Sequence, residues 1–302
     1  MLNSKERGVV LQMQSYSIND GAGVRTTIFL SGCPLRCKWC ANPETWTTER
    51  KLVFYKHKCI GCGRCKNICP NGLDPVNMKR PNEECETCGK CVQTCLNKSL
   101  DIACTLKDAQ EVVERVKKEE IFFRYTGGGI TFSGGEPFVQ SEFLRTLVNK
   151  FSILGIDMWI ETCGYFEFDN VKDIISELSH VFLDLKHMDS DKHKEYTGVG
   201  NEKILENAKK INEMGIPITV RIPSIPGVNL TEENIRNTAK FMKENMKGAT
   251  IELLPYHELG KAKYTSLGIE DKYNKFTTPT NEELEFAYDI FKEYEIIIEE
   301  YK

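Results

Sequence analysis

The chain has 302 residues, of which 40% are hydrophobic and 28% are charged, a composition typical of a globular protein. Its 40 Lys and Arg residues against 44 Asp and Glu residues give a net charge of −4, which argues against nucleic acid as the main partner. No apolar run is long enough to span a membrane, and Met1–Gln14 does not resemble an export signal, so we expect a cytoplasmic protein without a membrane anchor.

From Arg25 onward the sequence predicts alternating strands and helices. The expected strands are Arg25–Leu30, Ile130–Phe132, Met158–Glu161, Val181–Leu185, Ile218–Ile222 and Ile251–Leu254. Apolar stripes at helical spacing lie between them, at Ala109/Val112/Val113/Val116, Phe143/Leu147/Val148/Phe151, Val171/Ile174/Ile175/Leu178, Ile235/Ala239/Met242 and Leu284/Ala287/Phe291. This alternation indicates consecutive βαβ units, and hence an α/β fold with a parallel sheet and core-facing helices.

Cysteine is unusually frequent, with 13 residues, and most of them are clustered. Without an export signal, clustered cysteines indicate metal ligands rather than disulfides. Eleven of them form three groups, which are Cys33/Cys37/Cys40, Cys59/Cys62/Cys65/Cys69 and Cys85/Cys88/Cys91/Cys95. The region 50–104 is rich in Cys, Gly, Lys and Asn, so we expect a small inserted domain there, within a main domain of residues 1–49 and 105–302. The sequence assigns no role to Cys104 or Cys163.

The second and third cysteine groups repeat the pattern C-x2-C-x2-C-x3-C at a constant offset of 26 residues. This is the spacing of ferredoxins with two cubic iron–sulfur clusters, in which the fourth cysteine of each run binds the other cluster. We therefore expect one 4Fe–4S cluster on Cys59, Cys62, Cys65 and Cys95, and another on Cys85, Cys88, Cys91 and Cys69. Zinc is the alternative, because paired C-x2-C is also a zinc signature.

The first group, C-x3-C-x2-C, has three cysteines and no fourth nearby. A cubic cluster held by three thiolates keeps one iron open, and an open position distinguishes a catalytic metal site from a structural one. The group follows the strand Arg25–Leu30, which places it at the catalytic end of a parallel α/β barrel. The alternatives are a zinc site completed by His57 or a structural cluster.

Four motifs resemble a known family. Cys33-Pro-Leu-Arg-Cys37-Lys-Trp39-Cys40 is similar to the signature of radical S-adenosylmethionine (SAM) enzymes. Gly21-Ala-Gly-Val-Arg25, Ser133-Gly-Gly-Glu-Pro137 and Leu254-Pro-Tyr-His257 resemble segments of the enzymes that activate glycyl radical enzymes. The resemblance implies a partial (β/α)6 TIM-like barrel, and the insert resembles the ferredoxin-like two-cluster domain of the larger activating enzymes.

Polar residues recur at the carboxyl ends of successive strands, which meet at one mouth in a barrel. The resemblance implies that Gly134, Gly135 and Glu136 contact the amino group of SAM and that Lys186 and Arg221 bind its carboxylate. It also implies cofactor contacts by Trp39 and His257, a position for Glu161 near the ribose, and a catalytic role for Lys186 beside Cys33, Cys37 and Cys40. A monovalent cation is expected on Glu161, Thr162 and Asp184. A plain ion pair is the alternative for Asp184 and Lys186.

The function implied is activation of a glycyl radical enzyme of the decarboxylase, dehydratase or C–N/C–S lyase type. One electron from the three-cysteine cluster cleaves SAM to methionine and a 5′-deoxyadenosyl radical, which takes a hydrogen from a glycine of the partner. The expected cofactors are SAM, three 4Fe–4S clusters and a monovalent cation. Flavodoxin or ferredoxin is the expected electron donor, and the protein is expected to be a monomer. The alternatives are a radical SAM enzyme acting on a small molecule or peptide, and a ferredoxin-type electron carrier.

Overall fold

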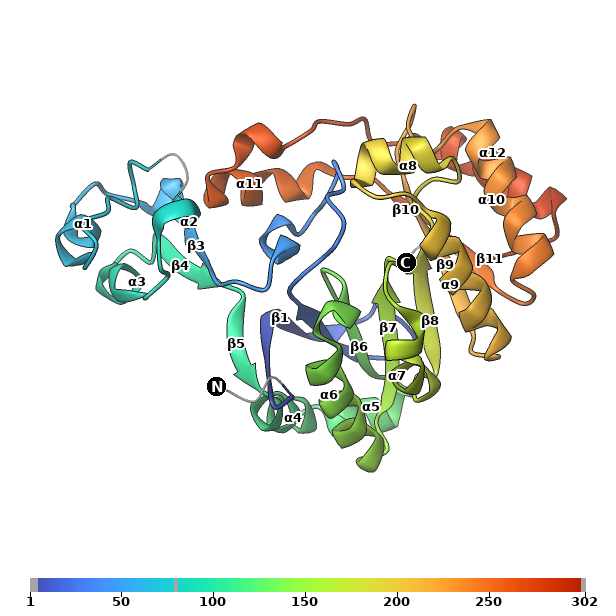
Figure 1. Ribbon diagram of the computed structural model, residues 1–302, viewed down its shortest axis with the longest axis horizontal. Helices are drawn as coiled ribbons and strands as arrows, with labels where there is room; N and C mark the ends of the chain where they lie inside the picture. The colour runs from blue at the N-terminus through green and yellow to red at the C-terminus, as the bar shows by residue number, and fades with distance from the viewer. Residues whose placement is uncertain (1–4, 79–80, 300–302) are drawn as a thin grey trace.

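The computed structural model describes residues 5–78 and 81–299. Its main sheet has nine strands in the order β11-β10-β9-β8-β7-β6-β2-β1-β5 (Figure 1). Six neighbouring strands are parallel: β2 (Arg25–Leu30), β6 (Gly129–Gly134), β7 (Asp157–Thr162), β8 (His180–Asp184), β9 (Ile218–Ser224) and β10 (Thr250–Pro255). These strands confirm all six predicted ones, so the expected α/β fold with a parallel sheet is correct.

Three further strands extend the sheet beyond the predicted six. β1 (Arg7–Ser17) pairs antiparallel with β2, and β5 (Thr105–Asp108) pairs antiparallel with β1. β11 (Ile297–Ile298) adds to the other edge, parallel to β10. The sequence analysis missed β1 and β5. β5 is a short edge strand that is stabilised mainly by its pairing with β1, and such pairing leaves little local signal.

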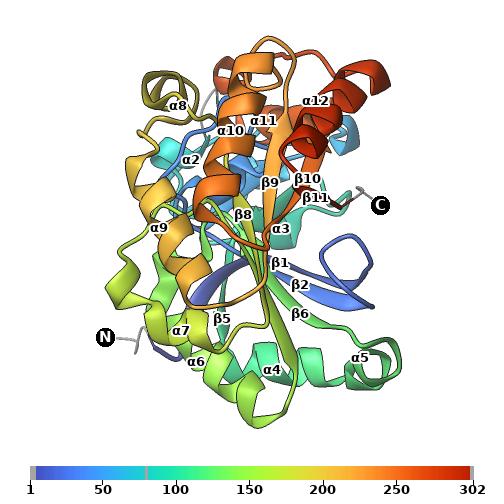
Figure 2. The same cartoon turned by 90° about the vertical axis from the view of Figure 1, so that its right-hand side faces the viewer.

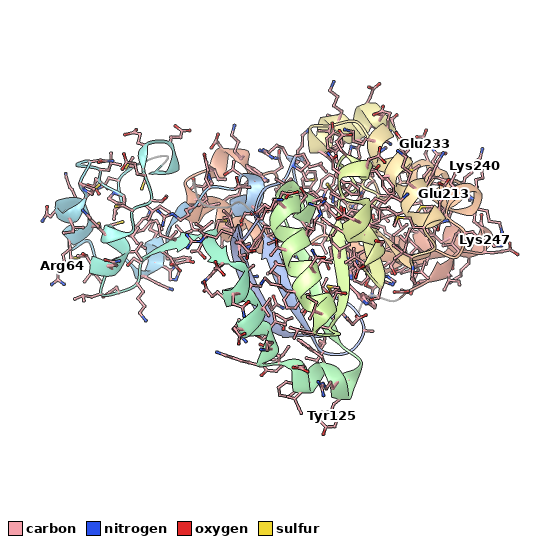
Figure 3. The ribbon with its side chains drawn as sticks, turned by 60° about the horizontal axis from the view of Figure 1, so that its bottom comes forward. Arg64, Tyr125, Glu213, Glu233, Lys240 and Lys247 are labelled. Atoms are coloured by element: carbon pink, nitrogen blue, oxygen red, sulfur yellow. The ribbon has the colours of Figure 1, made fainter. Side chains whose placement is uncertain are left out.

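Helices cover one face of the sheet (Figure 2). They are α4 (Ala109–Lys117), α6 (Ser141–Ile153), α7 (Lys172–Ser176), α9 (Glu202–Glu213), α10 (Glu232–Asn245) and α12 (Asn281–Glu293). Side-chain caps define several of their first residues: Asp108 caps α4, Thr231 caps α10, and Thr280 and Glu283 form a capping box at α12. The outer surfaces of α9 and α10 are charged, as Glu213, Glu233 and Lys240 show (Figure 3).

The predicted helical stripes face the core, as expected. Apart from the half-buried Leu284, every residue in the five stripes is buried against the sheet. After β5, the unpredicted helices are α5 (Glu120–Thr126), α8 (Ser190–Thr197), α9 and α11 (Lys261–Leu267). Short 3-10 turns are η1 (Pro43–Trp46), η2 (Lys56–Lys58), η3 (Pro137–Gln140), η4 (Phe168–Asn170), η5 (Glu258–Gly260) and η6 (Glu270–Lys272). No helix among residues 5–78 and 81–299 is long and apolar enough to cross a membrane.

The two faces of the parallel strands differ in polarity. Ile28, Phe132 and Val220 belong to the apolar core under the helices. The alternate positions point to the opposite face, where the strands carry Thr27, Ser133, Glu161, Asp184, Arg221 and Glu252. Parallel strands buried on both faces are normally apolar throughout, so this polar face is a departure that indicates a functional surface.

The segment between β2 and β5 forms a small separate layer beside α11 (Figure 1). It contains β3 (Lys51–Phe54) paired antiparallel with β4 (Leu100–Ala103), and the short helices α1 (Arg64–Ile68), α2 (Pro81–Glu84) and α3 (Lys90–Thr94). Its buried apolar core, within the described residues, consists of Leu52, Cys91 and Leu100. So small a core supplies little folding free energy, and natural domains of this kind add disulfides or metal sites.

Arg25 is fully buried at the start of β2. It donates to Thr131 at 2.8 Å and to the carbonyl of Ile130, and it pairs with Asp157 at 2.9 Å. We predict that Arg25→Leu lowers the free energy of unfolding by about 3 kcal/mol, because these acceptors lose their donor. Urea unfolding followed by circular dichroism measures the change.

The control is Arg124→Leu, which removes an exposed ion pair with Glu120. It should change the free energy of unfolding by less than about 0.5 kcal/mol. Equal effects of the two substitutions would show that the buried network around Arg25 does not stabilise the sheet.

Candidate functional site

A cavity of about 260 Å3 opens at the carboxyl edge of the parallel sheet. Its walls come from the segments that end all six parallel strands, including Cys33 after β2, Gly134 in β6, Cys163 after β7 and Asp184 in β8. From the sequence-predicted residues it collects Cys33, Cys37, Trp39, Cys40, Gly134, Gly135, Asp184, Lys186 and His257. Side chains from distant parts of the chain therefore meet at one point, as expected for strand ends in a parallel α/β fold.

Backbone hydrogen bonds hold the loop of Cys33, Cys37 and Cys40 from several sides. The N–H of Arg36 donates to the Thr197 carbonyl at 2.7 Å, and the N–H of Lys38 donates to the Tyr196 carbonyl at 2.9 Å, which ties the loop to α8. From α11, the hydroxyl of Tyr264 donates to the Cys40 carbonyl at 3.0 Å. The loop thus has a defined conformation.

The three thiols of this loop are free of disulfide bonds. Burial raises the pKa of Cys37 to about 12 and that of Cys40 to about 11, because the interior disfavours the thiolate. Both groups are therefore neutral thiols at pH 7, and they would ionise only on binding a metal.

Trp39 lies in the cavity wall, with its ring 6.1 Å from the rings of both Tyr196 and Phe276. His257 follows β10 on the same wall, and its Nδ1 accepts a hydrogen bond from the N–H of Leu259 at 3.3 Å. Trp39 therefore contributes an aromatic group to the cavity lining, and His257 contributes a polar one.

Gly134 and Gly135 lie where β6 approaches the end of β2. A β-carbon on Gly134 would lie 2.2 Å from the Leu30 carbonyl oxygen, and one on Gly135 would lie 2.3 Å from that of Gly32. Gly134 also has φ of +120°, which L side chains rarely adopt. Close packing of the backbone at the cavity wall therefore requires both glycines.

Lys186 and Asp184 form an ion pair of 2.6 Å in the cavity wall. Burial alone would lower the pKa of Lys186, but the Asp184 carboxylate outweighs it and raises that pKa above its usual value. Lys186 therefore stays cationic. The structure thus shows the ion pair that was the alternative interpretation, and the roles of Asp184 and Lys186 in binding a cofactor or cation stay predictions.

Glu136 does not line the cavity, although it was predicted to contact the cofactor. Its buried carboxylate accepts hydrogen bonds from the Thr162 hydroxyl at 2.8 Å, the Cys163 N–H at 2.8 Å and the Phe138 N–H at 3.2 Å. These bonds connect the turn after β6 to the end of β7. Glu136 thus lies outside the cavity lining, where its hydrogen bonds support the segments that form the cavity wall.

Arg221 and Glu161 are also absent from the cavity lining. Arg221 pairs with Glu161 at 2.5 Å and with Glu252 at 2.6 Å, and Glu161 accepts a hydrogen bond from Ser133. The three charged side chains form a compact group on the polar face of the sheet. The sequence analysis did not include Glu252, whose role depends on pairing with a neighbouring strand.

The side chains predicted to hold a monovalent cation each have another partner. Glu161 is bound to Ser133 and Arg221, Thr162 donates to Glu136, and Asp184 pairs with Lys186. His57, the candidate fourth zinc ligand, lies on η2 beside Tyr55, with a ring distance of 6.2 Å, and does not line the cavity.

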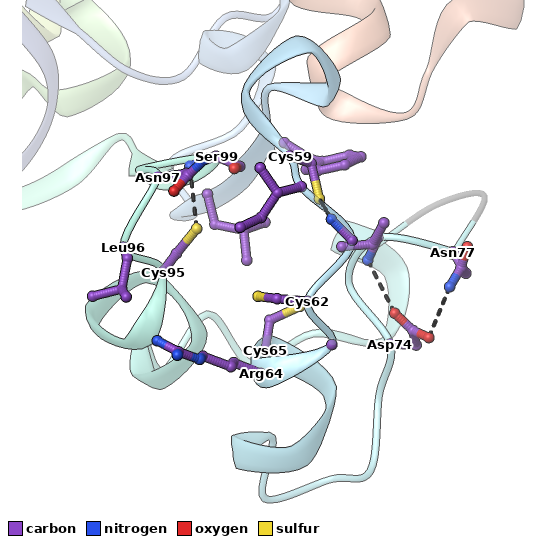
Figure 4. A pocket seen from close by; sticks show the side chains of 16 residues that line it. Cys59, Cys62, Arg64, Cys65, Asp74, Asn77, Cys95, Leu96, Asn97 and Ser99 are labelled. Atoms are coloured by element: carbon purple, nitrogen blue, oxygen red, sulfur yellow. Dashed lines mark hydrogen bonds between the residues drawn. The ribbon is translucent and has the colours of Figure 1, made fainter.

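Two further cavities lie in the insert between β2 and β5. The first, of about 270 Å3, is lined by Cys59, Cys62, Cys65 and Cys95, whose side chains surround it in Figure 4. The second is lined by Cys69, Cys85, Cys88 and Cys91. The structure thus brings together the two sets expected from the exchange of the fourth cysteine.

The two halves of the insert share their local geometry. Gly63 and Gly89 precede α1 and α3 with φ of +72° and +80°, and Gly61 and Thr87 have φ of +69° and +50° at equivalent positions. Backbone N–H groups at Gly61 and Thr87 donate to the sulfurs of Cys59 and Cys85 at 3.4 and 3.3 Å. No three Cys, His, Asp or Glu side chains among the described residues meet as ligands of a single metal ion.

Comparison with known proteins identifies the family that the sequence motifs resemble, and the matches extend over most of the chain. The radical SAM superfamily model matches residues 27–242. The chain is 37% identical to the 4-hydroxyphenylacetate decarboxylase activating enzyme of Clostridioides difficile, over 94% of this chain and 93% of that one. It is 38% identical to the isethionate sulfite-lyase activating enzyme of Oleidesulfovibrio alaskensis, over 88% of each chain.

Among solved structures, a domain of a pyruvate-formate lyase-activating enzyme from Bacteroides vulgatus is 31% identical with a TM-score of 0.50. The match covers 58% of this chain and 99% of that domain.

Proposed function

The chain belongs to the radical SAM superfamily and, within it, to the activating enzymes of glycyl radical enzymes, and on this basis we propose which of its residues carry the reaction. The observation that supports the proposal most directly is the cavity at the carboxyl edge of the sheet. It places three free thiols, two obligatory glycines and a buried lysine together.

Cys33, Cys37 and Cys40 would hold a 4Fe–4S cluster. The three thiols of the C-x3-C-x2-C loop line one cavity, to which the end of β7 adds the separate thiol of Cys163, and His57 lies elsewhere. The three thiols of the loop suit a cluster with one open iron. When bound, the cluster supplies one electron to SAM, whose cleavage yields methionine and the 5′-deoxyadenosyl radical that takes a hydrogen from the partner's glycine.

Among the described residues, Lys186 is the one Lys or Arg that lines the cavity, and it would bind the SAM carboxylate. Asp184 orients Lys186, and the Gly134–Gly135 turn leaves backbone groups free of side-chain cover at the amino end of SAM. Trp39 and His257 would contact other parts of the molecule. The aromatic wall around Trp39 would keep water from the radical.

Arg221 and Glu161 would act from positions outside the cavity lining. Because Arg221 is held by Glu161 and Glu252 at once, we infer that it fixes the Glu161 carboxylate in position for the ribose rather than reaching the SAM carboxylate itself. The cation site on Glu161, Thr162 and Asp184 stays a prediction, since each side chain already has a protein partner.

The parallel strands with their helices would form a partial (β/α)6 barrel from residues 1–49 and 105–302. Its open side would admit the glycine loop of the partner. Residues 50–104 would form a ferredoxin-like insert with two 4Fe–4S clusters, one on Cys59, Cys62, Cys65 and Cys95 and one on Cys69, Cys85, Cys88 and Cys91. The small core of the insert supports this proposal, because metal binding would supply the missing folding free energy.

The insert would receive electrons from flavodoxin or ferredoxin. Cys62 is exposed and lines the first cavity together with the exposed apolar residues Ile60 and Leu96. Arg64 projects from α1 at the outer end of the insert (Figure 3), and it gives this face positive charge. Apolar residues with a basic rim suit docking of an acidic protein.

The partner would be a glycyl radical enzyme of the decarboxylase, dehydratase or C–N/C–S lyase type. The two relatives described above activate a decarboxylase and a sulfite-lyase, respectively. Identities of 37% and 38% do not separate these classes, so the partner has to be identified by activation itself.

We predict that the protein, reconstituted under anaerobic conditions, binds about twelve irons and twelve sulfides. With SAM and dithionite it should form methionine and 5′-deoxyadenosine, and a cognate partner should show the doublet of a glycyl radical in its electron paramagnetic resonance (EPR) spectrum. Cys37→Ala should bind about four irons fewer and cleave no SAM, because its cluster lacks a ligand.

Cys104→Ala is the matched control. Cys104 is also buried, but it lies outside the cavity lining, so iron content and SAM cleavage should be unchanged. Zinc in place of iron in the wild type would contradict the whole assignment. SAM cleavage without a glycyl radical in any candidate partner would contradict the proposed partner class alone.

A second prediction concerns the insert. Cys62→Ala should lose about four irons and keep SAM cleavage with dithionite, which reduces the remaining clusters directly. With reduced flavodoxin or ferredoxin its rate should fall several-fold relative to the wild type. Steady-state formation of 5′-deoxyadenosine with each reductant measures the difference. Equal losses with both reductants would indicate a structural role for this cluster.

A further inference from the structure

Asn229 is a fully buried side chain whose amide joins the ends of two strands of the cavity wall. It lies in the turn between β9 and α10. Its Nδ2 donates to the carbonyls of Lys186 and Pro223 at 3.0 and 2.5 Å, and its Oδ1 accepts from the N–H of Ile225 at 2.8 Å. Lys186 and Pro223 both line the cavity. A single side chain therefore fixes the backbone of two residues of the site.

The hydrogen bond to Lys186 lies where the pairing of β8 with β9 ends. The last pair in register is Asp184 with Arg221, and the N–H of Leu185 still donates to the Arg221 carbonyl at 3.0 Å. Lys186 follows outside the strand, so its carbonyl needs a partner other than the sheet. The Asn229 amide is that partner, and it extends the connection between the two strand ends as far as the lysine.

Two more buried asparagines hold the irregular segment after β8. Asn201, which precedes α9, donates from Nδ2 to the carbonyls of His187 and Met188 at 3.0 and 2.8 Å. Asn234 of α10 accepts from the N–H of Met188 at 2.8 Å and donates to the carbonyl of Asn229 at 2.9 Å. Side-chain amides thus replace backbone hydrogen bonds that this segment lacks, and without them its buried polar groups would be costly.

We propose that Asn229 is a positioning residue of the SAM site, because it fixes the backbone of Lys186 and so keeps the Lys186 ammonium beside Asp184 in the cavity wall. The inference rests on the proposed function, in which Lys186 binds the SAM carboxylate. A lysine side chain that has to be ordered when its ligand arrives binds that ligand less tightly than one already held in place. Asn229 would therefore increase the affinity for SAM without touching SAM.

A purely structural role of Asn229 is the competing interpretation. The two roles differ in how they depend on Lys186. If Asn229 acts through Lys186, its removal weakens SAM binding only while the lysine is present. A general loss of packing, or a shift of the wall at Pro223, weakens SAM binding whether or not the lysine is present. A double-mutant cycle measures this difference, because it isolates the coupling between two side chains.

The experiment is equilibrium dialysis of radiolabelled SAM against the anaerobically reconstituted protein, without a reductant so that SAM stays intact. The four proteins of the cycle are the wild type, Asn229→Ala, Lys186→Met and the double variant. Asn229→Ala should weaken SAM binding by about tenfold relative to the wild type. In the Lys186→Met background the same substitution should change SAM binding by less than about twofold.

Asn207→Ala is the matched control. Asn207 is buried on α9, and its Nδ2 donates to the carbonyls of Gly164 and Phe166 at 2.8 Å each. Neither of these residues lines the cavity. The substitution removes two donors from backbone carbonyls, as Asn229→Ala does, but it leaves the segment of Lys186 intact. Asn207→Ala should therefore keep the wild-type affinity for SAM.

Wild-type affinity in Asn229→Ala overturns the inference, and so does an equal loss of affinity in both backgrounds. Where circular dichroism shows that Asn229→Ala does not fold, Asn229→Ser takes its place in the same cycle, since it keeps one hydroxyl donor. The role of Lys186 in the proposed function fails separately, through a Lys186→Met variant that binds SAM like the wild type, and the positioning role then fails with it. The radical chemistry itself fails through a wild type that binds SAM but does not cleave it when reduced, and the binding cycle still decides this inference.

Discussion

The arrangement of the site depends on the conformation of one loop, which presents three thiols at the end of β2. That conformation is set by neighbours and not by the loop itself. The N–H of Glu136 donates to the Gly32 carbonyl at 2.7 Å, α8 binds the backbone of Arg36 and Lys38, and α11 binds Cys40 through Tyr264. Three separate elements therefore have to be folded before the thiols reach their positions. This explains why the short motif alone does not make a site, and why the residues that support it are spread over more than two hundred positions.

Charge balance is the second requirement of this fold. The polar face of the sheet buries carboxylates and cations that would be costly alone. Arg221 lies between Glu161 and Glu252, and Lys186 faces Asp184, so each buried cation has a carboxylate partner. The network holds the side chains in fixed positions. Such preorganised polar groups suit a cavity that has to bind a zwitterionic molecule and exclude water from a reactive intermediate.

Local patterns predicted much of the fold. The six parallel strands and the five helical stripes follow from periodicity within short windows, and these the structure confirms. The cysteine groups were recognisable because their spacing is itself local. β1 and β5 were missed because their stability depends on pairing across the chain. The short α8 and α11 have little periodic signal, yet they fix the cysteine loop.

The site was less predictable where side-chain direction matters. Glu136 follows two cavity glycines in sequence, but its carboxylate turns inward to Thr162 and Cys163. Arg221 lies on the correct face of β9, and its pairing with Glu252 of β10 keeps it from the cavity lining. Trp46 also lines the cavity but had no sequence signal, because its place there depends on the packing of its ring against Tyr264. Residue spacing in the sequence predicts which helices and strands lie together. The contacts that each side chain makes depend on tertiary packing.

The helix α11 contacts both the insert and the cysteine loop, and so it connects the two regions. Beside the first insert cavity lies a groove lined by Cys59 and Phe54 on one side and by Thr265 and Ser266 of α11 on the other. The same helix supplies Tyr264 to the cysteine loop. The insert has a small apolar core of its own, so under the proposed assignment of two clusters its packing against α11 would depend on its cysteines being held in place. The position of α11, and with it the backbone of Cys40, would then depend in part on the clusters of the insert.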